Sequence, residues 1–383
     1  MQTTTSAPEL TLVTGFWPQK NQHIRTSAVY VRLFEELIAH IDGAVRIICC
    51  ADPSLKDAIE KVIQPHANVT LKPIPTEDLR YVRERARFAD LVPAGSSNPL
   101  RDTIEYAMIV WSKLDVVNRI ADQFTNTSHV GWIDFGLPHV VELMDVDWGE
   151  VITESIRTDR IRLCERYATS PTEVVDPWYF YSNNSARVAG GLMTGSRKTW
   201  SDFTAHFNAE IDRMVPTGTY ALEEQVLAAL MAQRPDMFER WFADYFGMLK
   251  NVRHVRRDVE TVLTNLHHCR ADGIPSNGAS IVRFLLDSGA SNLRLEPEQC
   301  FHVLDDGLAC AIAAGDNDLA DLLAKTALSL FHYSRLGRGM MRGTWRRSLM
   351  ENLKTRSLDF SDKPWTWEEM TSRPEFPIWM SCF

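Results

Sequence analysis

The feature that most constrains the fold is an alternation of apolar runs and amphipathic segments at the start of the chain. Runs over residues 9–17, 45–51 and 68–74 have the length and composition of strands. Between them, residues 28–41 and 53–63 carry apolar side chains at helical spacing. Strands that alternate with helices pair in parallel through right-handed crossovers. We therefore predict an α/β fold built on a mostly parallel sheet.

A further buried strand is predicted within residues 128–136, and it ends in an acid. Asp134 follows the apolar Trp132 and Ile133 and precedes Phe-Gly. Ligands bind at the carboxyl edge of open α/β sheets, and a carboxylate is costly to bury unpaired. Asp134 is thus a candidate site residue. The alternative stays open that it caps a helix starting near Pro138, since Asp before Gly and Pro is also good turn chemistry.

One long helix is predicted over residues 102–124, where apolar residues form a stripe. Thr103, Tyr106 and Lys113 share a face beside that stripe, because their spacings return to nearly the same angle around a helix. These polar groups either reach a ligand at the sheet edge or form the boundary between core and water.

A literal Asp-x-Asp follows at Asp145 and Asp147, and this spacing places two carboxylates on one side of an extended segment. The Trp148 after them also fits a plain surface turn. Downstream, Gly190 and Gly191 interrupt a strand; such glycines either let a ligand or backbone approach closely or mark a bulge.

A nearly all-apolar helix is predicted to open at Thr219, which is a candidate N-cap, and to run through Met231. Glu223 and Glu224 fall in its first turn, where acids complement the helix dipole without any further function. Earlier in the chain, residues 76–99 hold four closely spaced arginines, which form either an anion-binding lid or a solvated loop.

Beyond residue 258 the predicted elements are helical, so we expect two domains, residues 9–257 and 258–383. Within the second, residues 335–347 are rich in arginine and would meet an anionic surface or simply be solvated. The tail, with Trp365 and Trp379, is aromatic enough to pack on the body or to form an oligomer contact.

Composition narrows the possible partners. The formal net charge of −9 argues against a nucleic-acid binder that works through overall basicity. No secretory signal and no apolar run long enough to span a bilayer is found, so we expect a cytoplasmic protein, with peripheral membrane contact as an option. The 7 cysteines lack metal-binding spacing and suit reduced thiols.

Several stretches, taken in order, resemble the HtrL/YibB family of bacterial proteins associated with cell-surface polysaccharide and lipopolysaccharide gene clusters. The resemblance covers about residues 10 to 255 and rests on the following pieces: residues 11–16, Arg101-Asp102-Thr103, Tyr106, Ser112-Lys113, residues 132–136, residues 188–191, residues 224–227, Phe238 and Asp244-Tyr245. That family resembles glycosyltransferases of the GT-A fold, in which a nucleotide-sugar donor binds at the carboxyl edge of a Rossmann-like half.

The resemblance implies a role for each matching piece. Asp134 would be a catalytic acid that faces a divalent cation, Mn²⁺ or Mg²⁺, bridging to the diphosphate. Glu224 would bind the acceptor or act as general base. The donor would be bound by the following residues: Thr14, Gly15, Phe16, Arg101, Lys113, Trp132, Gly190 and Gly191.

The sequence departs from the GT-A pattern at the second acid of Asp-x-Asp, which falls on Gly136. Either one carboxylate with water and substrate oxygens suffices for the metal, or the cation is absent. His139, Asp145 or Asp147 would be substitute ligands. A late histidine is the other source, and the candidates are His254, His267 and His268.

Three functional hypotheses follow. The first is a glycosyltransferase that moves a sugar from a nucleotide-diphosphate donor to an unknown glycan, lipid or protein acceptor, with a homo-oligomer as an option. The second is a non-catalytic binding or scaffolding protein that keeps the nucleotide-sugar fold, and Gly136 argues for it. The third, and weakest, is a metal-dependent hydrolase that uses Asp134 with His267 and His268.

Overall fold

The structure is a computed structural model of the full chain. It describes the following residues: 9–19, 25–41, 43, 45–95, 102–123, 126–166, 169, 171, 174–182, 187–243, 245–253, 263, 265–267, 269–270, 273, 275–287, 297–333, 351–356 and 365–372.

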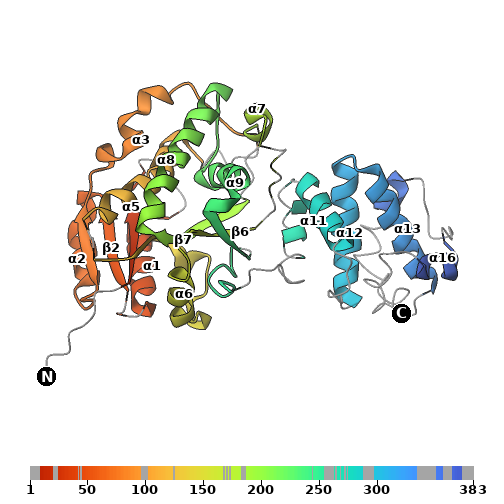
Figure 1. Ribbon diagram of the computed structural model, residues 1–383, viewed down its shortest axis with the longest axis horizontal. Coiled ribbons are helices and arrows are strands. Elements are labelled where there is room, and N and C mark those ends of the chain that lie inside the picture. Colours follow the sequence, from red (N-terminus) through yellow and green to blue (C-terminus); the bar gives the residue numbers. More distant parts are fainter. Residues whose placement is uncertain are drawn as a thin grey trace. The chain divides into compact units, whose positions relative to one another are not determined.

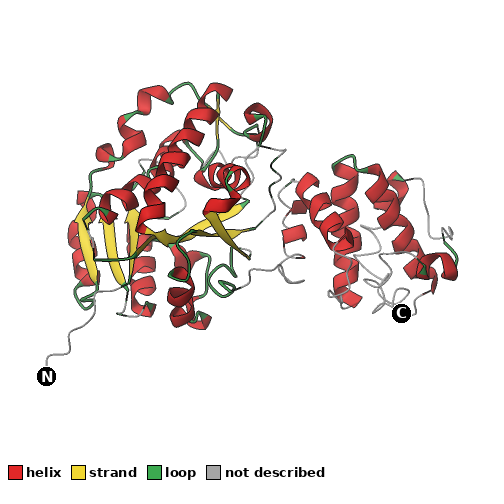
Figure 2. Cartoon of the chain, viewed as in Figure 1, coloured by secondary structure: helices red, strands yellow, loops and turns green. Residues whose placement is uncertain are grey.

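The chain divides into two compact units, residues 1–256 and 257–383. A seven-stranded sheet with helices on both faces makes up the first unit (Figures 1 and 2). Helices make up the described part of the second unit. The predicted fold class, a mostly parallel α/β region followed by a helical region, is therefore confirmed.

The large sheet has the strand order β3-β2-β1-β5-β7-β6-β9. Its strands are β1 (Leu10–Phe16), β2 (Arg46–Ala51), β3 (Val69–Pro73), β5 (His129–Ile133), β6 (Ile161–Glu165), β7 (Val188–Ser196) and β9 (Phe238–Phe242). All neighbouring pairs are parallel except those of β7, which runs antiparallel to both β5 and β6. A second, small sheet pairs β4 (Val92–Pro93) with β8 (Thr219–Tyr220).

The helices of the first unit complete the layers. They are α1 (Ser27–His40), α2 (Lys56–Ile63), α3 (Arg80–Arg83), α4 (Ile104–Trp111), α5 (Lys113–Ala121), α6 (Trp148–Ser155), α7 (Pro177–Phe180), α8 (Arg197–Met214) and α9 (Glu223–Gln233). Residues from α1, α2 and α6 pack in one core on one face of the sheet. Residues from α4, α5, α8 and α9 pack in another core on the opposite face (Figure 1).

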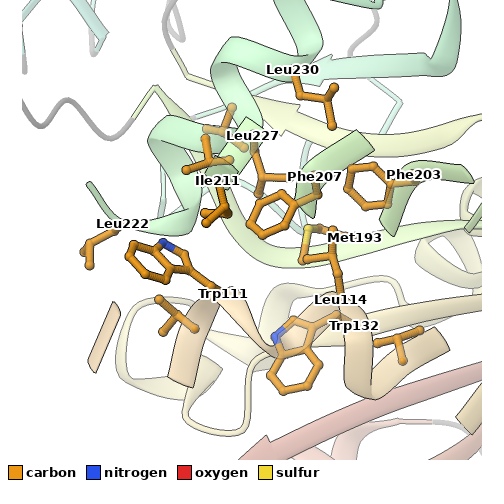
Figure 3. Close-up of a cluster of buried hydrophobic side chains, with 14 of the residues drawn as sticks. Trp111, Leu114, Trp132, Met193, Phe203, Phe207, Ile211, Leu222, Leu227 and Leu230 are labelled. Atoms are coloured by element: carbon orange, nitrogen blue, oxygen red, sulfur yellow. The ribbon is translucent and has the colours of Figure 1, made fainter. Parts of the chain in front are cut away.

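The core under α8 and α9 fixes the position of the Asp134 strand. Trp132 of β5 is buried there, and Figure 3 shows it below Met193 and beside Leu114. Phe207 of α8 and Leu227 of α9 lie in the same cluster (Figure 3). Because successive strand residues point to opposite faces, Ile133 enters the other core and Asp134 follows at the strand end.

The prediction of one helix over residues 102–124 is wrong in one respect, because the helix breaks at Ser112. The Ser112 hydroxyl donates to the Met108 carbonyl at 2.8 Å and accepts from the Tyr81 backbone N–H at 3.3 Å. A serine that bonds backbone in this way competes with the helical hydrogen bonds. The break makes Lys113 the first residue of α5.

The predicted N-cap at Thr219 is also wrong. Thr219 lies in β8, and α9 begins at Glu223 with Leu222 in the cap position. The strands β6 and β9 have no counterpart in the prediction. Arg162, Glu165 and Glu239 make them polar, and the buried charges of Arg162 are paired with Glu154 of α6.

In the second unit, α11 (Pro275–Asp287), α12 (Pro297–Ala313) and α13 (Asn317–Tyr333) pack in sequence, and α16 (Trp367–Thr371) contacts α13. The predicted basic face at 335–347 and the tail residue Trp379 lie outside the described residues.

The described cysteines are free and buried. Within the described ranges, no helix is both long and apolar enough to span a bilayer.

Candidate functional site

Three structural elements bring charged side chains together at the carboxyl edge of the sheet. Asp134 directly follows β5, and its backbone N–H donates to the Gly191 carbonyl of β7 at 2.9 Å. Lys113 opens α5, and Glu223 with Glu224 opens α9. The two helices lie on the same face of the sheet, so residues far apart in sequence converge here.

The Lys113 ammonium is the centre of this cluster. Its Nζ lies 3.0 Å from Asp134 Oδ1 and 2.5 Å from Glu223 Oε1. The Lys113 side chain is 9% exposed, the Glu223 side chain 6% and the Asp134 side chain 37%. Asp134 is therefore the member of the trio that faces solvent most.

Burial by itself would lower the pKa of the Lys113 ammonium, because it disfavours the charged form. The carboxylates of Asp134 and Glu223 outweigh that effect and raise the pKa. Lys113 thus carries a fixed positive charge at any physiological pH.

Trp132 holds the carboxylate of Asp134 from the other side. Its indole N–H donates to Asp134 Oδ1 at 2.7 Å, and the Lys113 ammonium lies 5.5 Å from its ring centroid. The same oxygen of Asp134 thus receives both the indole and the ammonium donor. The carboxylate is fixed in orientation before any ligand arrives.

Glu224, the next residue along α9, has different surroundings. Its Oε1 accepts a hydrogen bond from the Tyr245 hydroxyl, and the Arg166 guanidinium lies 4.0 Å from the Tyr245 ring centroid. Burial and then the neighbouring Glu223 carboxylate raise the pKa of Glu224 to about 7. The Tyr245 hydrogen bond and the positive charges of Arg166 and Lys113 act against this rise.

A cavity of about 130 Å³ opens beside Asp134 and Lys113. Its lining comes from the end of β1, from α1 and α4, and from the segment after β5: Gly15, Phe16, Trp17, Gln19, Tyr30, Tyr106, Ile109, Val110, Lys113, Trp132, Asp134, Phe135, Gly136 and His139. A larger cavity of about 840 Å³ lies between the α3 region and α4, and Gln19 and Ile109 line both. The two cavities are thus neighbours, and the lining of the larger one is more apolar.

Some of the predicted donor-binding residues line the small cavity and others do not. Gly15, Phe16, Lys113 and Trp132 line the small cavity, as does the predicted acid Asp134. Thr14 is fully buried within β1. The predicted role of Arg101 stays a prediction, because this residue lies outside the described residues.

The two glycines of β7 have different neighbours. A Cβ at Gly190 would meet Glu223 Oε1 at 3.7 Å, an ordinary van der Waals distance, so the described packing has room for it and the predicted contact of Gly190 with the donor stays a prediction. At Gly191 a Cβ would lie 2.9 Å from Met248 and 3.0 Å from Leu137. Packing alone therefore accounts for Gly191, and its predicted contact with the donor stays a prediction.

The divalent cation predicted at Asp134 also stays a prediction, but the described surroundings fit it poorly. Within the described ranges, no three His, Cys, Asp or Glu side chains come together in a metal-binding group. Asp134 already shares Oδ1 with an ammonium and an indole. His139 lines the cavity, but its Nδ1 is hydrogen-bonded to the Gly136 carbonyl.

The other proposed ligands have structural partners. Asp145 pairs with Lys250 at 3.1 Å, and Asp147 caps α6 by accepting from the Glu150 backbone N–H at 3.0 Å. His267 belongs to the second unit, where its Nδ1 lies 3.3 Å from Asp306. His254 and His268 lie outside the described residues.

The arginine segment at 76–99 is packed on the first unit. Tyr81 and Phe88 are buried there and make edge contacts with Trp111. Arg80 pairs with Asp115 at 3.9 Å. Arg83, Arg85 and Arg87 are exposed, so the solvated interpretation fits the described segment. Arg85 also lines the larger cavity, and an anion-binding role for it stays a prediction.

Sequence reasoning underestimated three residues. Glu223 was explained by the helix dipole alone, yet its carboxylate holds Lys113. Arg166 and Tyr245 received no role, although Tyr245 falls in a matching piece of the family resemblance. The available signal in the sequence was that Arg166 directly follows β6 and Tyr245 lies shortly after β9.

Comparisons with known proteins identify the family of this chain. A family described as "Bacterial protein of unknown function (HtrL_YibB)" matches residues 8–254, and the chain belongs to that family. No curated protein matches the chain. Among solved structures, mouse xyloside xylosyltransferase 1 in its apo form is similar at 9% identity and a TM-score of 0.35, over 59% of this chain and 83% of that one.

Proposed function

We propose that this protein is a glycosyltransferase that moves a sugar from a nucleotide-diphosphate donor to an acceptor hydroxyl. The observation that carries the proposal is the arrangement at the sheet edge, where a buried ammonium and a fixed carboxylate line one cavity. A second carboxylate, of raised pKa, follows Glu223 at the start of α9. Each of these three groups has a part in such a transfer.

Lys113 supplies positive charge where a diphosphate leaving group gains negative charge. In a site partly shielded from water, an oriented cation is worth far more than the same cation in bulk water. Asp134 accepts a hydrogen bond from a sugar hydroxyl through its second oxygen, since its first is bound to Lys113 and Trp132. These two residues bind and orient the donor.

Glu224 receives the proton of the acceptor hydroxyl as the acceptor oxygen bonds to the anomeric carbon. The bond from that carbon to the diphosphate oxygen breaks in the same process. A base with a pKa near the working pH is the most effective one, and the pKa of Glu224 is about 7. Tyr245 and Arg166 orient the carboxylate and stabilise its charged form.

The test is release of nucleoside diphosphate from a panel of nucleotide sugars, with candidate glycan, lipid and protein acceptors. Turnover that is lost in Asp134→Asn and in Glu224→Gln supports the proposal. If the wild-type protein binds nucleotide sugars but never turns them over, the second candidate, a binding protein, replaces the first. Gly136 is the observation that favours that candidate, because it removes one acid of the Asp-x-Asp pattern.

A further inference from the structure

Position 136, where the second acid of Asp-x-Asp is missing, has no room for a side chain unless Tyr30 moves. A Cβ built on Gly136 would lie 2.7 Å from Cε1 and 2.8 Å from Cδ1 of Tyr30. The Tyr30 ring is in turn stacked on Phe16, with centroids 4.7 Å apart. A carboxylate at position 136 would therefore have to displace an aromatic ring that lines the cavity.

Beside the remaining acid, the position of a cation is already taken by Lys113. Its ammonium lies 3.0 Å from Asp134 Oδ1, and Glu223 at 2.5 Å prevents it from swinging away. A divalent ion that bound the same carboxylate would lie a few ångströms from this ammonium. Two positive charges a few ångströms apart repel each other.

We infer that this site binds a nucleoside diphosphate without a divalent cation, with Lys113 as the fixed positive charge and Glu223 as the residue that positions it. The inference rests on the proposed function, since it concerns the leaving group of that reaction. The ammonium does not depend on metal supply, and its location is set by the fold through the break at Ser112 and the start of α9.

The first test needs no variant. Binding of UDP, ADP, GDP and CDP to the full chain is measured by calorimetry, with either excess EDTA or added Mg²⁺ or Mn²⁺. We expect at least one diphosphate to bind with the same affinity in both conditions. Binding that requires the cation overturns this inference and leaves the proposed function intact, whereas no binding in any condition overturns both.

The second test assigns the charge to Lys113. Lys113→Met keeps the apolar stem and removes the ammonium, and we expect it to weaken diphosphate binding by about tenfold or more. Lys113→Arg keeps a positive charge and should recover part of that loss. Thermal unfolding of each variant shows whether it is folded, and a folded Lys113→Met protein with wild-type affinity overturns the assignment.

Two substitutions of Glu223 separate positioning from charge. Glu223→Gln keeps an oxygen that accepts from Lys113 but removes a negative charge, so diphosphate should bind as well as in the wild type or better. Glu223→Ala frees the ammonium, and diphosphate should bind more weakly. Equal effects of the two substitutions on affinity would contradict the positioning role.

Discussion

The chain has two acidic motifs, and the one with the complete Asp-x-Asp spacing is not the one that lies at the candidate site. The complete Asp-x-Asp, Asp145 and Asp147, forms a surface ion pair with Lys250 and a helix cap. The incomplete one, Asp134 followed by Gly136, ends β5 beside Lys113 and a cavity. The difference shows that the position of an acid on the sheet, rather than the spacing of two acids, decides what it can do.

The largest expected loss of activity therefore comes from a substitution in the incomplete motif, at Asp134. Asp134→Asn should lower turnover of a nucleotide sugar by about a thousandfold, because it removes the negative charge beside Lys113 and leaves only one of the two oxygens as an acceptor. Its folded state should persist, since Glu223 still pairs with Lys113. Activity assays with thermal unfolding of the same samples check both statements.

Asp147→Asn is the matched control for that experiment. It makes the same chemical change in the complete motif, and asparagine caps helices as well as aspartate does. We expect wild-type activity and stability. A loss of turnover in the control similar to that in Asp134→Asn would show that the comparison between the motifs is mistaken.

The next largest effect concerns the proposed base. Glu224→Gln should reduce turnover by about a hundredfold or more, the usual contribution of general base catalysis. Binding of the donor diphosphate should change little, because Lys113 and Asp134 stay in place. Turnover and calorimetric affinity measured on one preparation separate the two, and a variant that loses both would argue against a base at this position.

The pH dependence gives a smaller effect with a definite sign. Activity should rise as the pH increases through about 7, because Glu224 accepts a proton only when ionised. Tyr245→Phe removes a hydrogen bond to the ionised form and should move this rise to higher pH. Glu223→Gln removes a neighbouring negative charge and should move it to lower pH. Shifts in the same direction would rule out Glu224 as the titrating group.

Titration of Glu224 also makes stability depend on pH, but in the opposite direction: its contribution to stability falls as the pH rises, whereas activity rises. The folded-state pKa of Glu224, about 7, lies above its ordinary value of 4.5, so folding favours the protonated form. Its contribution to the free energy of unfolding is full below about 4.5 and is lost as the pH rises through about 7. Denaturant unfolding of wild type and Glu224→Gln across this window measures the difference.

Local patterns were sufficient for the parts of this molecule that depend on local physics. Apolar periodicity predicted β1, β2, β3 and the helices between them, since burial of one face determines each. The position of Asp134 at a strand end was equally visible. Family resemblance contributed the predicted roles of Lys113 and Glu224. Local pattern alone left Lys113 either near a ligand or at the boundary of the core, and it explained Glu224 by the helix dipole.

The remaining features depend on contacts between distant segments. The Ser112 hydroxyl at the helix break accepts from Tyr81, and the Lys113 ammonium is held by Glu223 from another helix. Strands β6 and β9 pair with each other although their polar residues obscure the strand pattern. None of these features has a local signal, because each partner lies far away in sequence.

The smallest expected effect tests the structural side of the comparison. Asp147→Ala removes the side chain that accepts from the Glu150 backbone N–H, and loss of such a cap costs about 1 kcal/mol. Asp145→Ala removes only an exposed ion pair, which contributes roughly 0 to 1 kcal/mol. We expect both variants to keep full activity, with the larger drop in denaturant midpoint for Asp147→Ala. Reduced turnover in either variant, at a temperature where it is fully folded, would mean that the complete motif contributes to the chemistry after all.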